Sequence, residues 1–219
     1  MTGSKDRDLL RRRAPGKSPD KIWSLLFTTI LLSFYFIYFL LRIDPKLIYQ
    51  SQEPVFFFDR YFIYEFFSYP GGINEMVSGF FSQFFYYSWT GALLLVLVLA
   101  FVTINTWLFV QSITTNRPVL YLQWIPSVIL LALHSEYRFP LALTLGLLWV
   151  LLCVNIYIRL APSKSALRFL LFLILHVTLY YVTAGQAFIF SLVIILYEVL
   201  RNRRVILPLL YILLSALLP

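Results

Sequence analysis

The stretch that decides the fold runs from Asp44 to Trp89 and reads DPKLIYQSQEPVFFFDRYFIYEFFSYPGGINEMVSGFFSQFFYYSW. It carries five of the ten carboxylates of the chain, is dense in Phe and Tyr, and has no aliphatic run long enough to cross a bilayer. Aromatic rings favour the headgroup level of a membrane. The stretch therefore predicts an extracytoplasmic cap of two short helices lying on a bundle of membrane-spanning helices.

The composition of the whole chain supports a membrane bundle. With 219 residues, 60% hydrophobic residues and a mean hydropathy of +0.80, the chain is too apolar for a water-soluble domain. The formal net charge of +8 indicates basic cytoplasmic loops rather than nucleic-acid binding, because topogenic Lys and Arg gather there. The predicted fold class is therefore all-α, a polytopic transmembrane helix bundle.

Seven apolar runs follow a basic N-terminal tail. Residues 1–21 are rich in Lys and Arg and lack an apolar period, so they predict a disordered cytoplasmic tail, and residues 22–219 predict one membrane domain. A helix needs about 20 apolar residues to cross a bilayer, and several of the runs are shorter than that. The seven predicted spans are 22–41, 90–111, 120–133, 139–158, 169–183, 186–200 and 205–218.

The basic residues also predict the sidedness of the bundle. With the tail in the cytoplasm, fourteen of the eighteen Lys and Arg residues fall on the cytoplasmic side of the seven spans. The sequence thus predicts a cytoplasmic N-terminus and an outside cap. The last run, Val205–Pro219, ends without a polar tail, so we expect the C-terminus to be truncated.

Two helices are expected within the cap. Pro54–Tyr69 has aromatic residues on every face, which predicts a first helix buried against the bundle or sunk in the interface. After a Pro-Gly-Gly break, Asn74 is the expected N-cap of a second helix, with Glu75 in its first turn. Phe residues at helical spacing lie opposite Ser residues, as is typical of an amphipathic helix in the membrane plane.

Polar residues near the outer surface are the candidate site. Asp59 and Glu136 are the catalytic candidates, and Arg60, His134 and Arg138 are the substrate-binding candidates. If the cap folds over the turn that holds His134, a carboxylate, an imidazole and a guanidinium converge where a lipid phosphate could be held. The alternatives are structural: a local pair of Asp59 with Arg60, and a polar turn that satisfies helix ends.

The remaining polar residues predict no further site. Cys153 is the only cysteine and the two histidines are far apart, so the sequence predicts no metal site, and no motif predicts a cofactor. His176, in an apolar run, is expected to be a hydrogen-bonded packing residue rather than a proton relay. Glu198 is expected to pair with Arg201 across one helical turn.

Three segments carry a resemblance to a known family. They are SYPGGINEMVSGFFSQFFYYSWTGALLL over residues 68–95, LLALHSEYRFPLALTLGLL over residues 130–148 and YYVTAGQAFIFSLVIILYEVLRNRR over residues 180–204. These segments resemble an uncharacterised family, a domain of unknown function, of large polytopic inner-membrane proteins from Bacteroidota-type bacteria. The resemblance covers the chain from about residue 22 and implies a multi-pass protein of the bacterial inner membrane.

A coarser resemblance concerns architecture alone. One span, a long outside loop with membrane-parallel helices and then short spans is similar to the polytopic lipid-linked-sugar glycosyltransferases. That resemblance implies a lipid-linked sugar phosphate as substrate and an acidic residue in the first outside loop, at Asp44, Asp59 or Glu65. The first hypothesis is thus the membrane part of a glycosyltransferase-like enzyme that acts on a lipid-linked substrate in the outer leaflet. The alternative is a non-enzymatic membrane scaffold or envelope-assembly component; a transporter is less favoured, because no acidic residue lies in mid-span.

Overall fold

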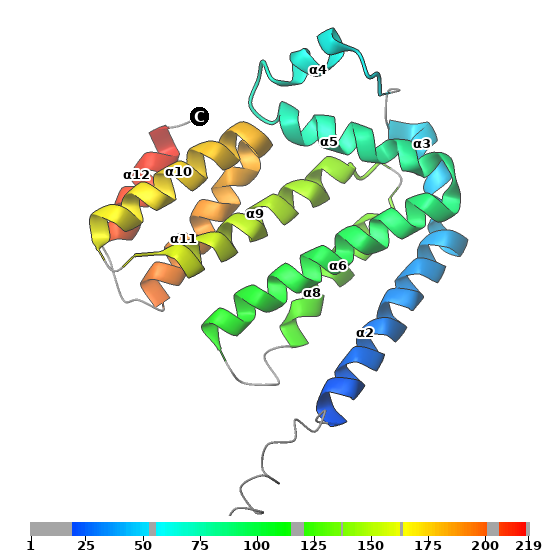
Figure 1. Cartoon of the computed structure of the whole chain (residues 1–219), viewed down its shortest axis with the longest axis horizontal. Helices are drawn as coiled ribbons and strands as arrows, with labels where there is room; N and C mark the ends of the chain where they lie inside the picture. The colour runs from blue at the N-terminus through cyan, green and yellow to red at the C-terminus, as the bar shows by residue number, and fades with distance from the viewer. Residues whose placement is uncertain are drawn as a thin grey trace, which may run out of the picture.

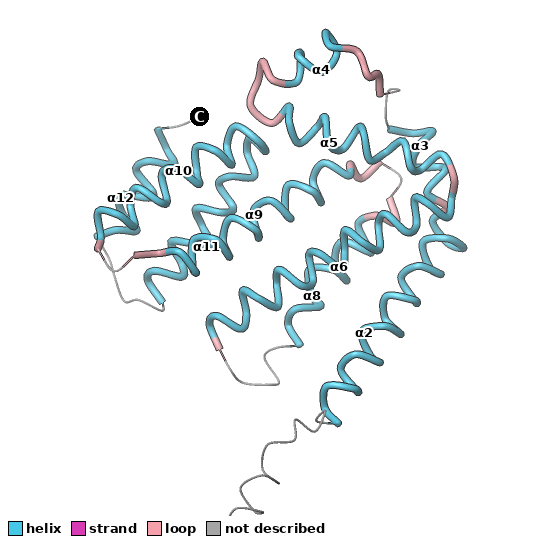
Figure 2. The backbone as a smooth tube through the Cα atoms, viewed as in Figure 1, coloured by secondary structure: helices cyan, strands magenta, loops and turns pink. Residues whose placement is uncertain are grey.

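The structure is a computed structural model that describes residues 19–52, 56–114, 121–136, 138–162, 164–200 and 206–217. Every regular element in these ranges is helical, which confirms the all-α prediction, and Figure 2 shows helices joined by short loops. The predicted tail falls on residues outside the described ranges, except for its last three residues, which belong to the first described helix. The principal helices are α2 (Pro19–Tyr38), α3 (Pro45–Gln52), α4 (Arg60–Phe66), α5 (Gly72–Ser82), α6 (Ser88–Ile113), α8 (Ile125–Leu133), α9 (Leu141–Leu160), α10 (Ser165–Thr183), α11 (Ala187–Leu200) and α12 (Ile206–Leu217).

Four helical stretches of the described chain are long and apolar enough to cross a membrane. They are Leu26–Ile43, Ser88–Ile113, Leu141–Leu160 and Ser165–Leu200. The chain is therefore a multi-pass membrane protein by length and composition, and the prediction of seven spans was wrong. At about 1.5 Å per residue, α12 with its 12 residues is far shorter than about 30 Å of hydrocarbon, and so is the apolar segment Tyr121–Leu133.

The predicted spans 169–183 and 186–200 lie in one of these four stretches. Ala184–Gln186 forms a single 3₁₀ turn between α10 and α11, and Ala184 has a φ of 52°. Figure 1 shows α10 and α11 as the two arms of a hairpin that reverses at this turn. The reversal occurs without a polar loop, so the hydropathy of this region is continuous across the turn.

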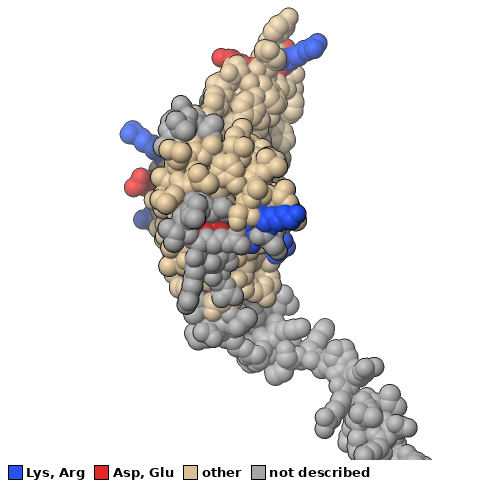
Figure 3. Space-filling model, turned by 90° about the vertical axis from the view of Figure 1, so that its left-hand side faces the viewer, with Lys and Arg blue, Asp and Glu red and all other residues tan. Residues whose placement is uncertain are grey.

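α9 is the central helix of the bundle because it contributes to two apolar cores. Its first half packs on α6, in a core that includes Phe39 from the π-helical turn Phe39–Ile43 after α2, Leu99 and Leu145, all of which are buried. Its second half packs with α10, α11 and α12 around Val154 and Phe172. Charged side chains are sparse on the side face drawn in Figure 3, as expected for a surface in contact with lipid.

Polar side chains also join α6, α9, α10 and α11 inside the bundle. Asn155 Nδ2 donates to the main-chain oxygen of Asn105 at 2.9 Å, and His176 Nδ1 lies 2.8 Å from Ser191 Oγ. Such bonds between helices stabilise membrane bundles, where the hydrophobic effect drives no association. His176 is buried and stacks on Phe172, so the expectation of a hydrogen-bonded packing residue is confirmed.

A buried ion pair fastens the far end of the hairpin. Arg168 Nη1 lies 2.7 Å from Glu198 Oε1, and the Tyr157 hydroxyl donates to the same oxygen at 2.7 Å. The expected partner of Glu198, Arg201, lies outside the described residues. The pair links α10 to α11 at the ends opposite their connecting turn, and Tyr157 adds α9 to the cluster.

The loop between α2 and α6 forms the cap, with one more helix than predicted, because α3 precedes the two expected helices. The first expected helix is shorter than predicted: residues 56–59 are not helical, and α4 begins at Arg60 because Asp59 caps it by accepting a hydrogen bond from Tyr61 N. α4 has no buried residue, so burial against the bundle was wrong. The alternative of a helix in the interface stays a prediction.

α5 differs from its prediction in two respects. Its N-cap is Gly71, whose φ of 91° favours glycine, rather than Asn74, which lies in the first turn with Glu75. Asn74, Ser78 and Ser82 are buried, whereas Phe80 and Phe84 are exposed. The polar face of α5 thus packs on the bundle, where Asn74 bonds Ala142 O. Val77 and Phe81 border this contact and pack against the first apolar core, whereas Phe80 and Phe84 point away.

The glycine at the start of α5 gives the first testable prediction. A Cβ added at Gly72 would lie 2.0 Å from the main-chain oxygen of Phe66, so Gly72→Ala forces α4 and α5 apart. We expect this variant to lose about 1–3 kcal/mol of unfolding free energy, measured by denaturant titration in detergent micelles. Gly185→Ala is the control, because no heavy atom lies within 4 Å of its added Cβ. Equal stability of the two variants would contradict the packing of α4 on α5.

The buried ion pair gives the second prediction. Arg168→Leu removes the guanidinium that lies 2.7 Å from the buried Glu198 carboxylate, and we expect a loss of about 3–5 kcal/mol of unfolding free energy. Adding Glu198→Gln removes the buried negative charge and should restore part of the loss. Lys164→Ala, an exposed basic residue at the start of the same helix, should change stability little. If the Arg168→Leu protein is as stable as the Lys164→Ala protein, the ion pair between Arg168 and Glu198 does not stabilise the bundle.

Candidate functional site

Among the described residues, three hydrogen bonds hold the α4–α5 part of the cap on the bundle. Gly71 N donates to Tyr181 O at 2.8 Å, and the Tyr181 hydroxyl donates to Phe67 O at 2.7 Å. Asn74 Nδ2 donates to Ala142 O at 2.7 Å. The bonds reach the last turn of α10 and the first turn of α9, so these two helix ends position the cap.

A partly open cavity of about 410 Å³ lies between the cap and α9. Its size is within the range of small-molecule sites, and most of its lining is apolar. Its walls come from the segment before α4, from α4 and α5, and from the first turn of α9 and the residue before it. The lining residues are Phe56, Phe62, Phe66, Glu75, Ser78, Gly79, Pro140, Ala142 and Leu143. We call this space the cap cavity.

Glu75 is the only charged residue among the described residues that line the cap cavity. The Tyr69 hydroxyl donates to Glu75 Oε2 at 2.6 Å, which fixes the carboxylate at the start of α5. Burial, followed by the hydrogen bond and the charge of Glu75, raises the pKa of Tyr69 to about 12. Tyr69 therefore remains a neutral donor to Glu75 at ordinary pH.

Ser78 is the second polar side chain of the cap cavity. It lies one turn after Asn74 on the same face of α5 and is 1% exposed, and its Oγ has no hydrogen-bond partner among the described residues. The next serine on this face, Ser82, instead donates to Gly79 O at 2.8 Å. A buried hydroxyl without a partner is destabilising, so the Ser78 hydroxyl is a group for which a ligand or an ordered water is expected.

Asp59 and Arg60, predicted from the sequence, lie at the start of α4 and are exposed. Asp59 Oδ2 accepts from Tyr61 N at 3.2 Å, which is the geometry of a helix cap. The side chains of Asp59 and Arg60 form no ion pair with each other among the described residues. Neither residue belongs to the described lining of the cap cavity.

His134, Glu136 and Arg138 lie in the turn that joins α8 to α9. His134 is 1% exposed, and its Nε2 lies 2.9 Å from Thr144 Oγ1 in the first turns of α9. Burial lowers the pKa of His134 to about 4, so it is neutral at ordinary pH. Glu136 and Arg138 are exposed, and within the described residues no hydrogen bond or ion pair joins their side chains to Asp59 or Arg60.

The structure therefore places His134 against α9. It places neither Asp59 and Arg60 nor Glu136 and Arg138 in the described lining of the cap cavity. Glu75 and Ser78 are the polar side chains that line the cavity. From the sequence, both were predicted only as parts of an amphipathic helix and not as site residues. The signal that could have found them is the spacing of Asn74, Ser78 and Ser82, which places three small polar residues on one helical face. In a helix expected to lie in lipid, such a face points to contact with polar groups of the bundle.

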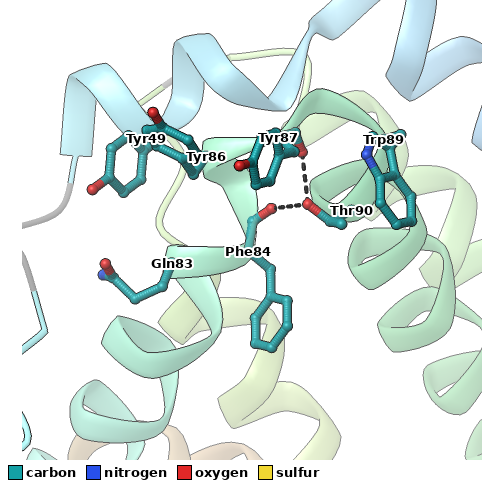
Figure 4. A pocket seen from close by; sticks show the side chains of 7 residues that line it. All are labelled: Tyr49, Gln83, Phe84, Tyr86, Tyr87, Trp89 and Thr90. Atoms are coloured by element: carbon teal, nitrogen blue, oxygen red, sulfur yellow. Dashed lines mark hydrogen bonds between the residues drawn. The ribbon is translucent and has the colours of Figure 1, made fainter.

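A second cavity of about 500 Å³ lies beside the start of α6 (Figure 4). Aromatic rings make most of its lining, and the Thr90 hydroxyl donates to Phe84 O and to Tyr87 O. The described lining contains no charged residue, and aromatic residues at a helix end are typical of the membrane interface. The lining residues are Tyr49, Gln83, Phe84, Tyr86, Tyr87, Trp89 and Thr90.

A third, smaller cavity of about 230 Å³ lies between α2, α6 and the helical turn before α8, and its described lining is also uncharged. Among the described residues, no group of three or more His, Cys, Asp or Glu side chains is placed to hold a metal ion. The cap cavity is therefore the place where a carboxylate, a buried hydroxyl and a helix end meet.

The fold and the cavity define a class, a multi-pass membrane protein with a helical cap over one end of its bundle. The family model described as "Family of unknown function (DUF6057)" matches residues 20–219, and the chain belongs to this family. No curated protein and no solved structure matches the chain.

The buried imidazole gives the third prediction. Because the pKa of His134 is about 4 in the folded state and about 6.5 when exposed, the unfolded state binds the proton first as the pH falls. Stability from His134 is complete above pH 6.5 and falls by about 1.4 kcal/mol per pH unit between pH 6.5 and 4.

Denaturant titrations at several pH values check this, with His134→Gln as the comparison, since an amide can still bond Thr144 without titrating. The wild-type protein should lose more stability than the variant between pH 6.5 and 5. Parallel curves for the two proteins would show that His134 does not titrate in this range.

Proposed function

We propose that the chain is the membrane part of a glycosyltransferase-like enzyme that binds a lipid-linked sugar phosphate in the cap cavity. The observation that carries the proposal is the cavity itself, because phenylalanine rings and one hydrogen-bonded carboxylate line the same space between the cap and the bundle. An apolar wall suits the lipid part of such a substrate, and a few placed polar groups suit its head.

In this proposal Glu75 is the general base. A hydroxyl of the acceptor attacks the anomeric carbon of the donor sugar, and the bond between that carbon and the phosphate oxygen breaks with its electron pair on the phosphate. The proton of the acceptor hydroxyl passes to the Glu75 carboxylate and then to water. The hydrogen bond from Tyr69 orients the carboxylate for this transfer.

The proposed location is the bacterial inner membrane, with the N-terminus in the cytoplasm and the cap outside. The charge distribution supports this orientation. α9 begins beside the cap, and its other end carries Arg159, followed by Lys164 and Arg168 at the start of α10. Basic residues thus gather at the end of α9 that lies away from the cap, as the cytoplasmic ends of membrane helices do.

The candidates from the sequence keep their place in the proposal, the four charged residues as outer residues of the site and His134 as a buried residue below it. Asp59 and Glu136 are alternative bases, and Arg60, His134 and Arg138 are alternative contacts to the substrate. Their exposure, except for His134, leaves them accessible to an acceptor outside the cavity. The geometry favours Glu75, because it is the carboxylate in the lining of the cap cavity.

A scaffold remains the second candidate, and a specific observation favours it. Phe58, Tyr61 and Tyr64 are 81%, 85% and 74% exposed on the outer side of the cap. Phe56 packs edge to face on Phe62 and on Phe80, which ties α4 to α5 beneath the exposed rings of the cap. A partner protein in the envelope could bury such rings.

The fourth prediction tests the enzyme. Purified protein in lipid nanodiscs is incubated with a polyprenyl-phosphate-linked hexose that carries a radiolabelled sugar, and bacterial envelope fractions supply the acceptor. We expect label transfer and release of polyprenyl phosphate. Glu75→Gln should lower the transfer rate by about 100-fold or more, because general-base catalysis contributes that much, while the unfolding temperature stays unchanged.

Asp59→Asn and Glu136→Gln are compared in the same assay. Loss of transfer in one of them, with an active Glu75→Gln protein, would move the base out of the cap cavity. The enzyme proposal is wrong if all three variants are fully active, or if the wild-type protein transfers sugar from no lipid-linked donor. The scaffold would then be the remaining candidate.

A further inference from the structure

The floor of the cap cavity is the first turn of α9 and the residue before it. α9 is 20 residues long, its N-cap Pro140 makes no side-chain cap hydrogen bond, and its first turn contains no acidic residue. The first N–H groups of a helix have no acceptor four residues earlier, and together they carry about half a positive elementary charge. Leu143 N donates to Pro140 O at 3.1 Å, whereas Leu141 N and Ala142 N have no acceptor among the described residues. This floor therefore places the positive end of a long helix, with two N–H groups left to bond, at the cavity.

The Ser78 hydroxyl provides an independent observation at the same place. Ser78 lines the cavity together with Pro140, Ala142 and Leu143, is 1% exposed and has no hydrogen-bond partner in the described part of the chain. A hydroxyl on a helix commonly donates to a carbonyl of the preceding turn, as Ser82 does to Gly79 O. The Ser78 hydroxyl makes no such bond and is available to donate to a ligand.

We propose that the start of α9 and the Ser78 hydroxyl form a phosphate-binding site on the floor of the cap cavity. The inference rests on the proposed function and deepens it, because it names the group of the substrate that the floor receives. Backbone N–H groups at a helix start and a nearby hydroxyl are both donors, and a phosphate offers acceptor oxygens with negative charge.

The same geometry disfavours other ligands. A cation would meet the positive end of α9 and N–H groups that cannot coordinate it. A purely apolar group would leave the Ser78 hydroxyl without a partner and would not compensate the helix end. A phosphate satisfies both features at once.

Glu75 also lines the cavity, and its negative charge opposes a bound phosphate. Glu75 lies three residues before Ser78 on α5. The carboxylate of Glu75 accepts a hydrogen bond from the Tyr69 hydroxyl. In the transfer reaction the base acts on the acceptor, whereas the floor stabilises the charge that develops on the leaving phosphate. Removing the carboxylate should therefore stop transfer without weakening phosphate binding.

The fifth prediction is a binding experiment in maltoside micelles, which contain no phosphate. Titration calorimetry of the full chain uses dodecyl phosphate, dodecanol and inorganic phosphate as probes, with protein-free micelles as blanks. We expect dodecyl phosphate to bind and dodecanol not to compete with it. Ser78→Ala should weaken binding by about 10- to 100-fold, as expected for the loss of one hydrogen bond to a charged group.

Ser82→Ala is the matched control, because Ser82 is buried on the same face of α5 and its hydroxyl is already bonded to Gly79 O. It should bind like the wild-type protein, and Glu75→Gln should bind at least as tightly. Binding of inorganic phosphate with equal affinity supports a site for the phosphate group alone, and binding of dodecyl phosphate only supports a lipid-linked phosphate.

Absence of binding by either phosphate, or equal affinity of the Ser78→Ala and Ser82→Ala proteins, would overturn the inference. The unfolding temperature of each variant in the same micelles shows that the protein is folded. Phosphate binding without sugar transfer overturns the proposed function alone, whereas transfer without phosphate binding overturns this inference alone.

Discussion

The hydrogen bond from Asn74 to Ala142 O is the constraint on which the rest of the cap depends. It joins the first turn of α5 to the first turn of α9, the helix shared by both apolar cores. Since Glu75 follows Asn74 directly and Ser78 lies one helical turn later, one docked turn fixes both polar residues of the cap cavity. The cavity thus takes its geometry from the helix that contributes to both apolar cores.

The polarity of α5 explains how a helix so rich in phenylalanine can sit on a membrane bundle. Helices in lipid gain little from burying apolar side chains against each other, so small and polar residues make the close contacts. Asn74, Ser78 and Ser82 occupy that inner face, and Phe80 and Phe84 remain outside. The amphipathic pattern was therefore predicted correctly from the sequence, but pattern alone does not say which face meets the bundle.

The same limit separates the predicted fold from the observed one. Helix type and most bounds follow from apolar periodicity, as the agreement between residues 90–111 and α6 shows. The count of spans failed where length decides, in α8 and α12. The break at Ala184 between residues 169–183 and 186–200 was predicted correctly, although the two helices belong to one apolar stretch, Ser165–Leu200. Asp59 was found as a polar residue of the cap, but its place as a helix cap depends on where α4 begins. Contacts between distant segments, such as Arg168 with Glu198, leave no local signal in one sequence.

The chemistry of the cap cavity follows from how charge is divided within it. Thr144, the one polar residue near the start of α9, is hydrogen-bonded to the buried His134. Burial keeps the His134 imidazole neutral, so His134 brings no charge to this helix end. Pro140 cannot cap the helix through its side chain, and the positive end is left to the cavity. The one carboxylate of the described lining is tied to Tyr69 rather than to α9. If Glu75 is the base that we propose, a carboxylate on one wall and a helix start on the floor suit a reaction in which a proton leaves one group while negative charge appears on another.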